Sequence, residues 1–187
     1  MEESKYRHIA LLRGINVGGH AIIKMADLRM FFESFGLIDV VTYIQTGNIL
    51  FSTANANSEL LAQQLEEKLA STIRHKITIF VISPAELRKA AAQNPFNPDL
   101  RNEDKQCYLM FLTAEPDEVH RKALMDQQGE EYRFHIQDKV LYYAYSKKYA
   151  GRRRAINFEK VLGVIGTARS WKVINKLNEL STGQHEG

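Results

Sequence analysis

The residues best suited to chemistry lie in one short stretch, RGINVGGHAIIK, at positions 13–24. It follows an apolar run, carries three glycines and ends on a lysine just before a helical pattern begins. A glycine-rich loop ahead of a helix can bind phosphate through its backbone amides. The spacing nevertheless fits neither the P-loop nor the dinucleotide G-x-G-x-x-G pattern. On spacing alone, Gly14, Gly18 and Gly19 only supply positive φ angles to an irregular loop.

The polar residues around these glycines favour an anion site. Arg13 follows the predicted strand, Asn16 lies in the loop, and Lys24 stands where the next helix begins. A cation at a helix N-terminus opposes the helix dipole at about 0.3 to 1 kcal/mol, so a carboxylate would be the stabilising choice there. A bound anion would offset that cost. The ligand-binding hypothesis therefore includes Arg13, Gly14, Asn16, Gly18, Gly19 and Lys24.

A similar arrangement is predicted near the C-terminus, in GTARSWKVINKL. If Thr167 caps a helix over residues 168–180, Arg169 lies in its first turn and Lys172 just beyond it. Two helix N-termini would then carry cations, which suits an anion drawn to both. Chance is the alternative, because surface arginines are common and the penalty is small.

The stretch QTGN, residues 45–48, is a second polar feature. Gln45 and Asn48 could offer neutral donors to an amide, a base or a sugar. The alternative interpretation is structural, in which Gly47 and Asn48 simply make a hairpin turn. We weight the structural interpretation more heavily.

Other catalytic or metal-binding patterns are poorly supported. The histidines show no metal-ligand spacing, and the single Cys107 lies in an apolar run that predicts an inert, buried thiol. We expect no metal and no cofactor. For an enzyme, His20 or Asp27 would be the candidate acid or base; the catalytic residues are otherwise unknown.

The charge is unevenly distributed. Residues 139–176 contain ten basic residues and one acid, whereas the remaining chain has fifteen bases and twenty-one acids. A basic block of this kind fits an anionic partner, or else a solvated basic face. The charged N-terminus lacks a signal peptide and no apolar run is long enough to span a membrane, so we expect a cytoplasmic protein.

Hydrophobic periodicity predicts a first half of β-α-β-β-α-β order. It comprises a strand at 7–12, a helix from Met25 to Gly36, a hairpin around Thr46 and Gly47, a helix over 58–73 and a strand over 77–82. This order is that of the ferredoxin-like, or split βαβ, fold. We assign this subdomain to residues 1–83.

Residues 84–104 are predicted to form a helix and a linker. Ser83, Pro84 and Glu86 mark the start of the helix, and NPFNPDLRNED carries two prolines. Residues 105–187 then read as a strand, a helix over 116–128, a hairpin around Asp138 and Lys139, and helices over 156–162 and 168–180. This β-α-β-β-α-α order predicts an α+β protein whose second ferredoxin-like subdomain is incomplete.

Taken together, these motifs resemble a family of uncharacterised bacterial proteins, domain of unknown function 1697. The resemblance runs nearly end to end, through ALLRGINVGG, KMADLR, TYIQTGN and the arginine-tryptophan segment near Trp171. Family members usually have serine where this chain has Thr46. The resemblance implies two ferredoxin-like subdomains and no particular activity.

We therefore expect an uncharacterised protein that binds a phosphate-bearing ligand, a nucleotide or RNA, in a cleft beside the RGINVGG loop. Arg13, Lys24 and Arg169 would be the charge partners, with loop amides as donors. Two alternatives stay open, a small-molecule enzyme that uses the same cleft and a protein-interaction module with a basic face. The oligomeric state cannot be read from the sequence.

Overall fold

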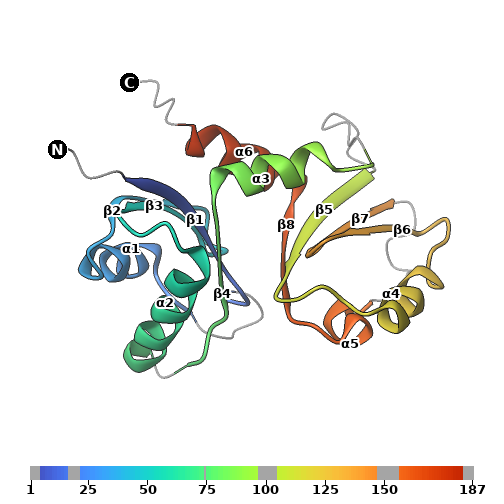
Figure 1. The fold of residues 1–187 in the computed structure, drawn as a ribbon, viewed down its shortest axis with the longest axis horizontal. Coiled ribbons are helices and arrows are strands. Elements are labelled where there is room, and N and C mark those ends of the chain that lie inside the picture. The colour runs from blue at the N-terminus through green and yellow to red at the C-terminus, as the bar shows by residue number, and fades with distance from the viewer. Residues whose placement is uncertain (1–4, 17–21, 74, 97–104, 147–155, 183–187) are drawn as a thin grey trace. The chain divides into compact units, whose positions relative to one another are not determined.

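The computed structural model describes residues 5–16, 22–73, 75–96, 105–146 and 156–182. The chain divides into two compact units (Figure 1). Unit 1 contains residues 1–88 and 177–187, and unit 2 contains residues 89–176. The boundaries fall inside two helices, α3 (Pro84–Ala92) and α6 (Trp171–Ser181).

Unit 1 has the predicted ferredoxin-like fold. Its elements are β1 (Tyr6–Leu12), α1 (Met25–Ser34), β2 (Ile38–Tyr43), β3 (Asn48–Thr53), α2 (Ser58–Ile73) and β4 (Ile79–Ile82). The strands form one antiparallel sheet in the order β2-β3-β1-β4. This order confirms the split βαβ arrangement.

Unit 2 repeats the fold and is more complete than the sequence predicted. Its elements are β5 (Lys105–Leu112), α4 (Glu118–Met125), β6 (Tyr132–Gln137), β7 (Val140–Ser146), α5 (Phe158–Leu162) and β8 (Gly166–Ser170). The sheet order β6-β7-β5-β8 matches that of unit 1. The expected β-α-β-β-α-α order was therefore wrong in one element, because GTARS pairs with β5 as a fourth strand instead of beginning the last helix.

Local signals set several boundaries as expected. Ser83 and Glu86 form a capping box at α3, with Ser83 N and Oγ donating to Glu86 Oε2 at 2.7 Å and Glu86 N donating to Ser83 Oγ at 3.2 Å. Gly36 has a φ of 78° just after α1, as a left-handed helix end requires. Of the predicted linker, residues 97–104 lie outside the described part of the chain.

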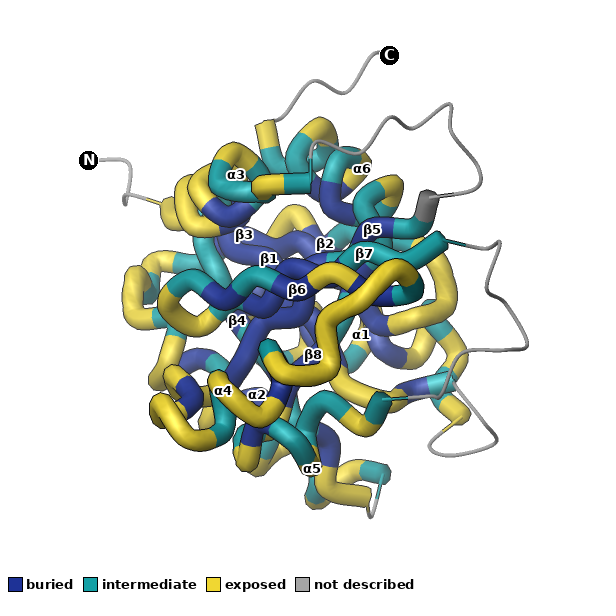
Figure 2. Tube along the Cα trace, turned by 90° about the vertical axis from the view of Figure 1, so that its right-hand side faces the viewer, coloured by how far each residue is buried: buried dark blue, intermediate teal, exposed yellow. Residues whose placement is uncertain are grey.

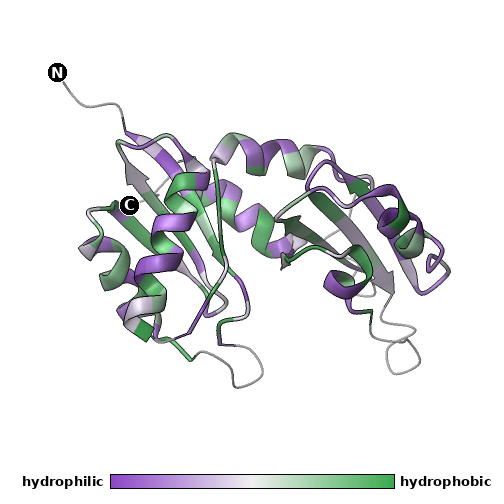
Figure 3. Ribbon diagram, turned by 60° about the horizontal axis from the view of Figure 1, so that its bottom comes forward, coloured by the Kyte–Doolittle hydropathy of each residue, from purple (hydrophilic) through white to green (hydrophobic). Residues whose placement is uncertain are grey.

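Each unit buries one sheet face under its two helices. In unit 1, Leu28 and Phe32 of α1 and three leucines of α2 pack on β1, β3 and β4. In unit 2, Leu124 of α4 and Leu162 of α5 pack on a more aromatic sheet. The strands are accordingly the most buried segments (Figure 2), and the helices alternate between hydrophobic and hydrophilic residues (Figure 3). Among the described helices, none is both long and apolar enough to cross a membrane.

Candidate functional site

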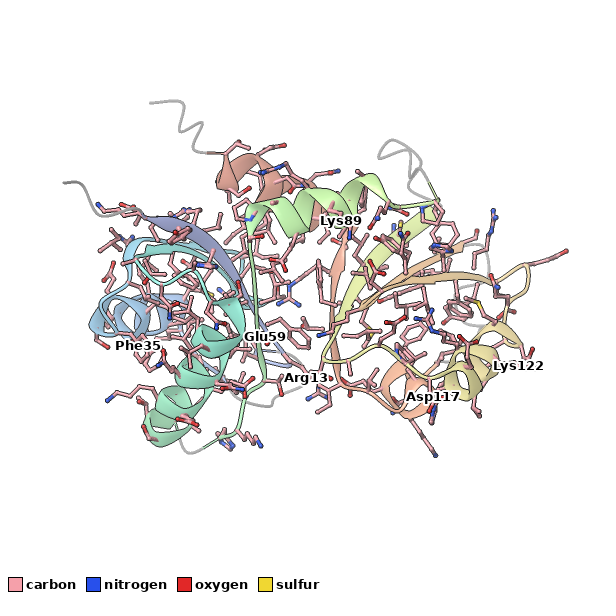
Figure 4. All side chains as sticks on the ribbon, in the orientation of Figure 1. Arg13, Phe35, Glu59, Lys89, Asp117 and Lys122 are labelled. Atoms are coloured by element: carbon pink, nitrogen blue, oxygen red, sulfur yellow. The ribbon has the colours of Figure 1, made fainter. Side chains whose placement is uncertain are left out.

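The glycine loop of unit 1 begins at the end of β1, where two backbone hydrogen bonds hold the residues at its start. Leu12 N donates to Gly47 O at 2.8 Å, and Arg13 N donates to Thr78 O at 2.9 Å. The loop therefore begins between the β2–β3 turn and the residue that precedes β4. Figure 4 shows Arg13 at this end of β1.

Asn16 fastens the loop to the β2–β3 turn. Its Nδ2 donates to Ile23 O at 2.9 Å and to Gln45 O at 2.8 Å, while Ile23 N donates to its Oδ1 at 2.8 Å. Its φ of 55° is a left-handed conformation that asparagine tolerates well. Because both amide hydrogens are used within the protein, Asn16 positions the loop rather than a ligand.

Gly47 lets the turn approach the loop closely. Its φ is 73°, and a Cβ atom at this position would lie 2.8 Å from both Ile15 Cδ1 and Leu12 Cβ. Ile15 is itself buried, with an exposed fraction of 1%. A glycine is therefore required here for two reasons, the backbone angle and the lack of space.

The two amides of QTGN have different environments. Asn48 is fully buried, and its Nδ2 donates to Tyr43 O at 3.0 Å and to Thr46 Oγ1 at 3.1 Å. Asn48 thus holds the hairpin turn, in agreement with the structural interpretation. The side chain of Gln45 is exposed, and only its carbonyl is bound by Asn16.

Two cations flank the fastened loop. Arg13 and Lys24 are both exposed, and Lys24 is the N-cap residue of α1, without a side-chain cap hydrogen bond. Asp27 supplies the acid of the first turn and is also exposed. Backbone amides at such a helix start can donate to an anion. Of the predicted ligand-binding residues, Arg13, Gly14, Asn16, Lys24, Gln45 and Asn48 belong to unit 1, and hydrogen bonds link Asn16 to Gln45 O and to Ile23, next to Lys24. Gly18, Gly19 and His20 lie outside the described residues.

Arg169 does not lie at a helix N-terminus, which corrects the prediction. It belongs to β8 in unit 2 and is buried, and its Nη1 donates to Thr167 Oγ1 and to Ala168 O, both at 2.8 Å. Burial lowers the pKa of its guanidinium to about 10. Thr167 is therefore not a helix cap, since α6 begins at Trp171. We remove Arg169 from the candidate ligand site.

The remaining reactive groups have structural environments. Cys107 is buried against Asn94, and burial raises the pKa of its thiol, as expected for an inert cysteine. Asp117 caps α4 by accepting from His120 N at 2.9 Å and from His120 Nδ1 at 2.8 Å. Across the described residues, no three His, Cys, Asp or Glu side chains gather as a metal ion would need.

Comparisons with known proteins identify the family and support the fold. The family described as "Protein of unknown function (DUF1697)" matches residues 6–142. The chain belongs to this family. Among solved structures, it is similar to the conserved bacterial protein SP0830 from Streptococcus pneumoniae, with a TM-score of 0.74 and 21% identity over 95% of this chain and 99% of that one. At that identity the likeness shows the fold alone. No curated protein matches the chain.

Proposed function

We propose that the loop of unit 1 binds a phosphate-bearing ligand, a nucleotide or RNA, between Arg13 and Lys24. One observation carries the proposal: two exposed cations flank a loop that Asn16 holds in place, at the uncapped start of α1. Guanidinium and ammonium groups pair with phosphate oxygens, and the first amides of a helix add donors. Gly14 and the exposed Gln45 complete this surface.

Placement of the cations also supports the proposal. A lysine at the start of α1 opposes the helix dipole. Asp27 compensates for part of this cost from within the first turn. The carbonyl of Lys24 accepts from Leu28 N at 3.0 Å, but its side chain makes no cap hydrogen bond at this helix start. A bound anion would pair with the lysine and with the first amides of the helix, so the interaction there would become favourable.

The test is thermal unfolding of the full chain with inorganic phosphate, pyrophosphate, nucleotides and short RNAs. A ligand at 100 times its dissociation constant should stabilise the protein by about 2.7 kcal/mol. The Arg13→Ala, Lys24→Ala double variant should lose that shift. A Lys139→Ala, Lys160→Ala double variant, which removes two exposed cations of unit 2, should keep it.

Two results would contradict the proposal. One is the absence of a shift with every anion at millimolar concentration. The other is an equal shift in the wild type and in the Arg13→Ala, Lys24→Ala variant. Salt then separates the ligand classes, because RNA affinity must fall steeply with ionic strength, whereas that of a small nucleotide falls only weakly.

A further inference from the structure

Each sheet of this protein has two edge strands, and an edge strand can pair with a strand of another chain. The sheet orders place β2 and β4 at the edges in unit 1, and β6 and β8 at the edges in unit 2. An exposed edge of this kind favours self-association, so folded proteins usually protect it. The four edges can therefore be compared by what protects each of them.

Three of the edges are altered by a bulge or by a carboxylate. The pairing of β2 with β3 shifts between Ile38 and Val41, and Asp39 within this shift has a φ of 52°. Such a bulge interrupts the regular ladder of an edge strand. In β4 and β8, a carboxylate oxygen of Glu66 or Glu159 accepts from the first amide of the strand.

The remaining edge, β6, is regular, and its protection comes from the segment before it. All six residues of β6 pair with β7 without a register shift, so alternate residues direct their backbone groups away from the sheet. Gln128 Oε1 accepts from Phe134 N at 3.0 Å, and Gly129 N donates to Tyr132 O at 3.0 Å. These contacts identify Tyr132, Phe134 and Ile136 as the residues with outward backbone groups.

We propose that Gln128 prevents β6 from pairing with the β6 strand of a second copy of this chain. Two identical antiparallel strands can satisfy each other about a two-fold axis. In a pair centred on Phe134, the Phe134 N and O of one copy would bond to the Phe134 O and N of the other, and Ile136 would pair with Tyr132. This pairing needs Phe134 N, which is the donor that Gln128 holds. It would also bind Phe134 O and both backbone groups of Ile136, which have no hydrogen-bond partner among the described residues.

Sedimentation velocity of the full chain, together with amide hydrogen exchange, tests this proposal. Gln128→Ala removes the acceptor, so exchange at Phe134 should accelerate by about tenfold in dilute protein. At about 1 mM this variant should form dimers in which the Phe134 and Ile136 amides are protected, whereas the wild type should not. Gln127→Ala is the matched control, because the side-chain amide of Gln127 donates to Ala123 O at 3.1 Å instead of contacting β6. It should sediment like the wild type.

Two further variants separate the hydrogen bond from the packing of the side chain. Gln128→Glu keeps an oxygen that can accept from Phe134 N, and should sediment like the wild type. Gln128→Met keeps a side chain of similar length beside Met125, whose Sδ accepts from Gln128 Nε2 at 3.2 Å, but it lacks the oxygen. It should associate as Gln128→Ala does. Since Gln128 is exposed, both substitutions are compatible with the fold.

Three results would overturn the proposal, and none of them bears on the loop of unit 1. One is that Gln128→Ala and Gln128→Met sediment like the wild type at about 1 mM, which would show that β6 needs no such protection. Another is association without protection of the Phe134 and Ile136 amides, because the contact would then lie outside β6. The third is equal association in Gln127→Ala, which would make the effect unspecific.

Discussion

The two units of this protein share one backbone framework and differ in what is attached to it. In unit 1, Leu12 N donates to Gly47 O and Arg13 N to Thr78 O; in unit 2, Leu112 N donates to Lys139 O and Thr113 N to Ile165 O. These pairs occupy the same places relative to the matched strands. The two units therefore have the same backbone hydrogen bonds at this end of their sheets.

A glutamate on the second helix of each unit extends the correspondence. Glu66 Oε1 of α2 accepts from Ile79 N at 2.7 Å, and Glu159 Oε1 of α5 accepts from Gly166 N at 3.0 Å. Each accepted amide belongs to the first residue of the last strand in its sheet. This shared hydrogen bond supports an internal duplication of the ferredoxin-like fold.

The main difference is the segment after the first strand. Between β1 and α1 lie residues 13–24, whereas between β5 and α4 lie only residues 113–117. Unit 2 folds with the short connection, so the long loop of unit 1 is not needed to complete this topology. Long loops in compact domains are often functional, and this contrast supports a ligand role for the loop.

The helices differ as well. The sixteen-residue α2 of unit 1 corresponds to the five-residue α5 of unit 2. Aromatic side chains compensate for the missing turns, since the Phe158 ring of α5 lies 4.6 Å from that of Tyr143 and 5.8 Å from that of Phe134 between centroids. A large ring buries enough apolar area to hold a very short helix.

The largest effect is expected at Gly47, where the turn meets the loop. Gly47→Ala forces a left-handed alanine against Ile15 and Leu12, and should lower the free energy of unfolding by about 3 kcal/mol. Gly14→Ala is the control, because Gly14 has a similar φ of 70° but, apart from its chain neighbours, no atom of the described residues within 4 Å of an added Cβ. It should cost only about 1 to 2 kcal/mol. Equal losses in urea denaturation would show that the close contact is unimportant.

The next largest effect is expected at Asn16, which is present in the loop of unit 1 and has no counterpart in the short connection of unit 2. Asn16→Gly keeps the left-handed angle but removes three hydrogen bonds, and should cost about 1.5 to 3 kcal/mol. Amide hydrogen exchange should accelerate at Ile23 in unit 1 and stay unchanged at Leu112 in unit 2. If anion binding survives Asn16→Gly at full strength, the fastened loop is not the binding element.

The paired glutamates, Glu66 and Glu159, provide a matched test in the two units with a somewhat smaller expected effect. Glu66→Ala and Glu159→Ala each leave a strand amide without its carboxylate, at a cost of about 1 to 2 kcal/mol. Glutamine should restore much of the loss, because its amide oxygen can still accept. Exchange rates of the Ile79 and Gly166 amides should respond separately, each to its own variant. If exchange accelerated in only one of the two variants, the two glutamates would not be equivalent.

The smallest effect concerns the short connection of unit 2. Hydrogen bonds from the His120 backbone and ring lower the pKa of Asp117, so this carboxylate stabilises the fold above its ordinary titration range near pH 4. That stability is lost as pH falls through its lowered folded-state pKa. Urea midpoints from pH 2 to 5 should fall less steeply in Asp117→Asn, which keeps an acceptor for the cap. Identical pH profiles would count against the assignment.

Most of the fold could be predicted because its signals are local. The capping box at Ser83, the glycine after α1 and the hairpin around Asp138 depend on neighbours in sequence. The strand β8 could not be predicted in this way. Its residues GTARS fit a helix start, and only pairing with β5 and the burial of Arg169 decide otherwise.

The sequence suggests which residues make up the candidate site, but it does not reveal the hydrogen bonds among them. Positions such as Arg13, Lys24 and Gln45 follow from their residue types and from the ends of predicted elements. The role of Asn16 does not, because its three bonds join residues 16, 23 and 45 across the fold. Asn48 was likewise ambiguous until its burial was known, since a buried amide must satisfy its own hydrogen bonds.

The division of the chain has a consequence for synthesis. Unit 2 is one continuous stretch, residues 89–176, whereas unit 1 also needs residues from Leu177 onward. Leu177 is fully buried, so it is a core residue. Because synthesis runs from the N-terminus to the C-terminus, the ribosome makes all of residues 89–176 before it adds Leu177. Unit 2 can therefore begin to fold before unit 1 has received this buried residue.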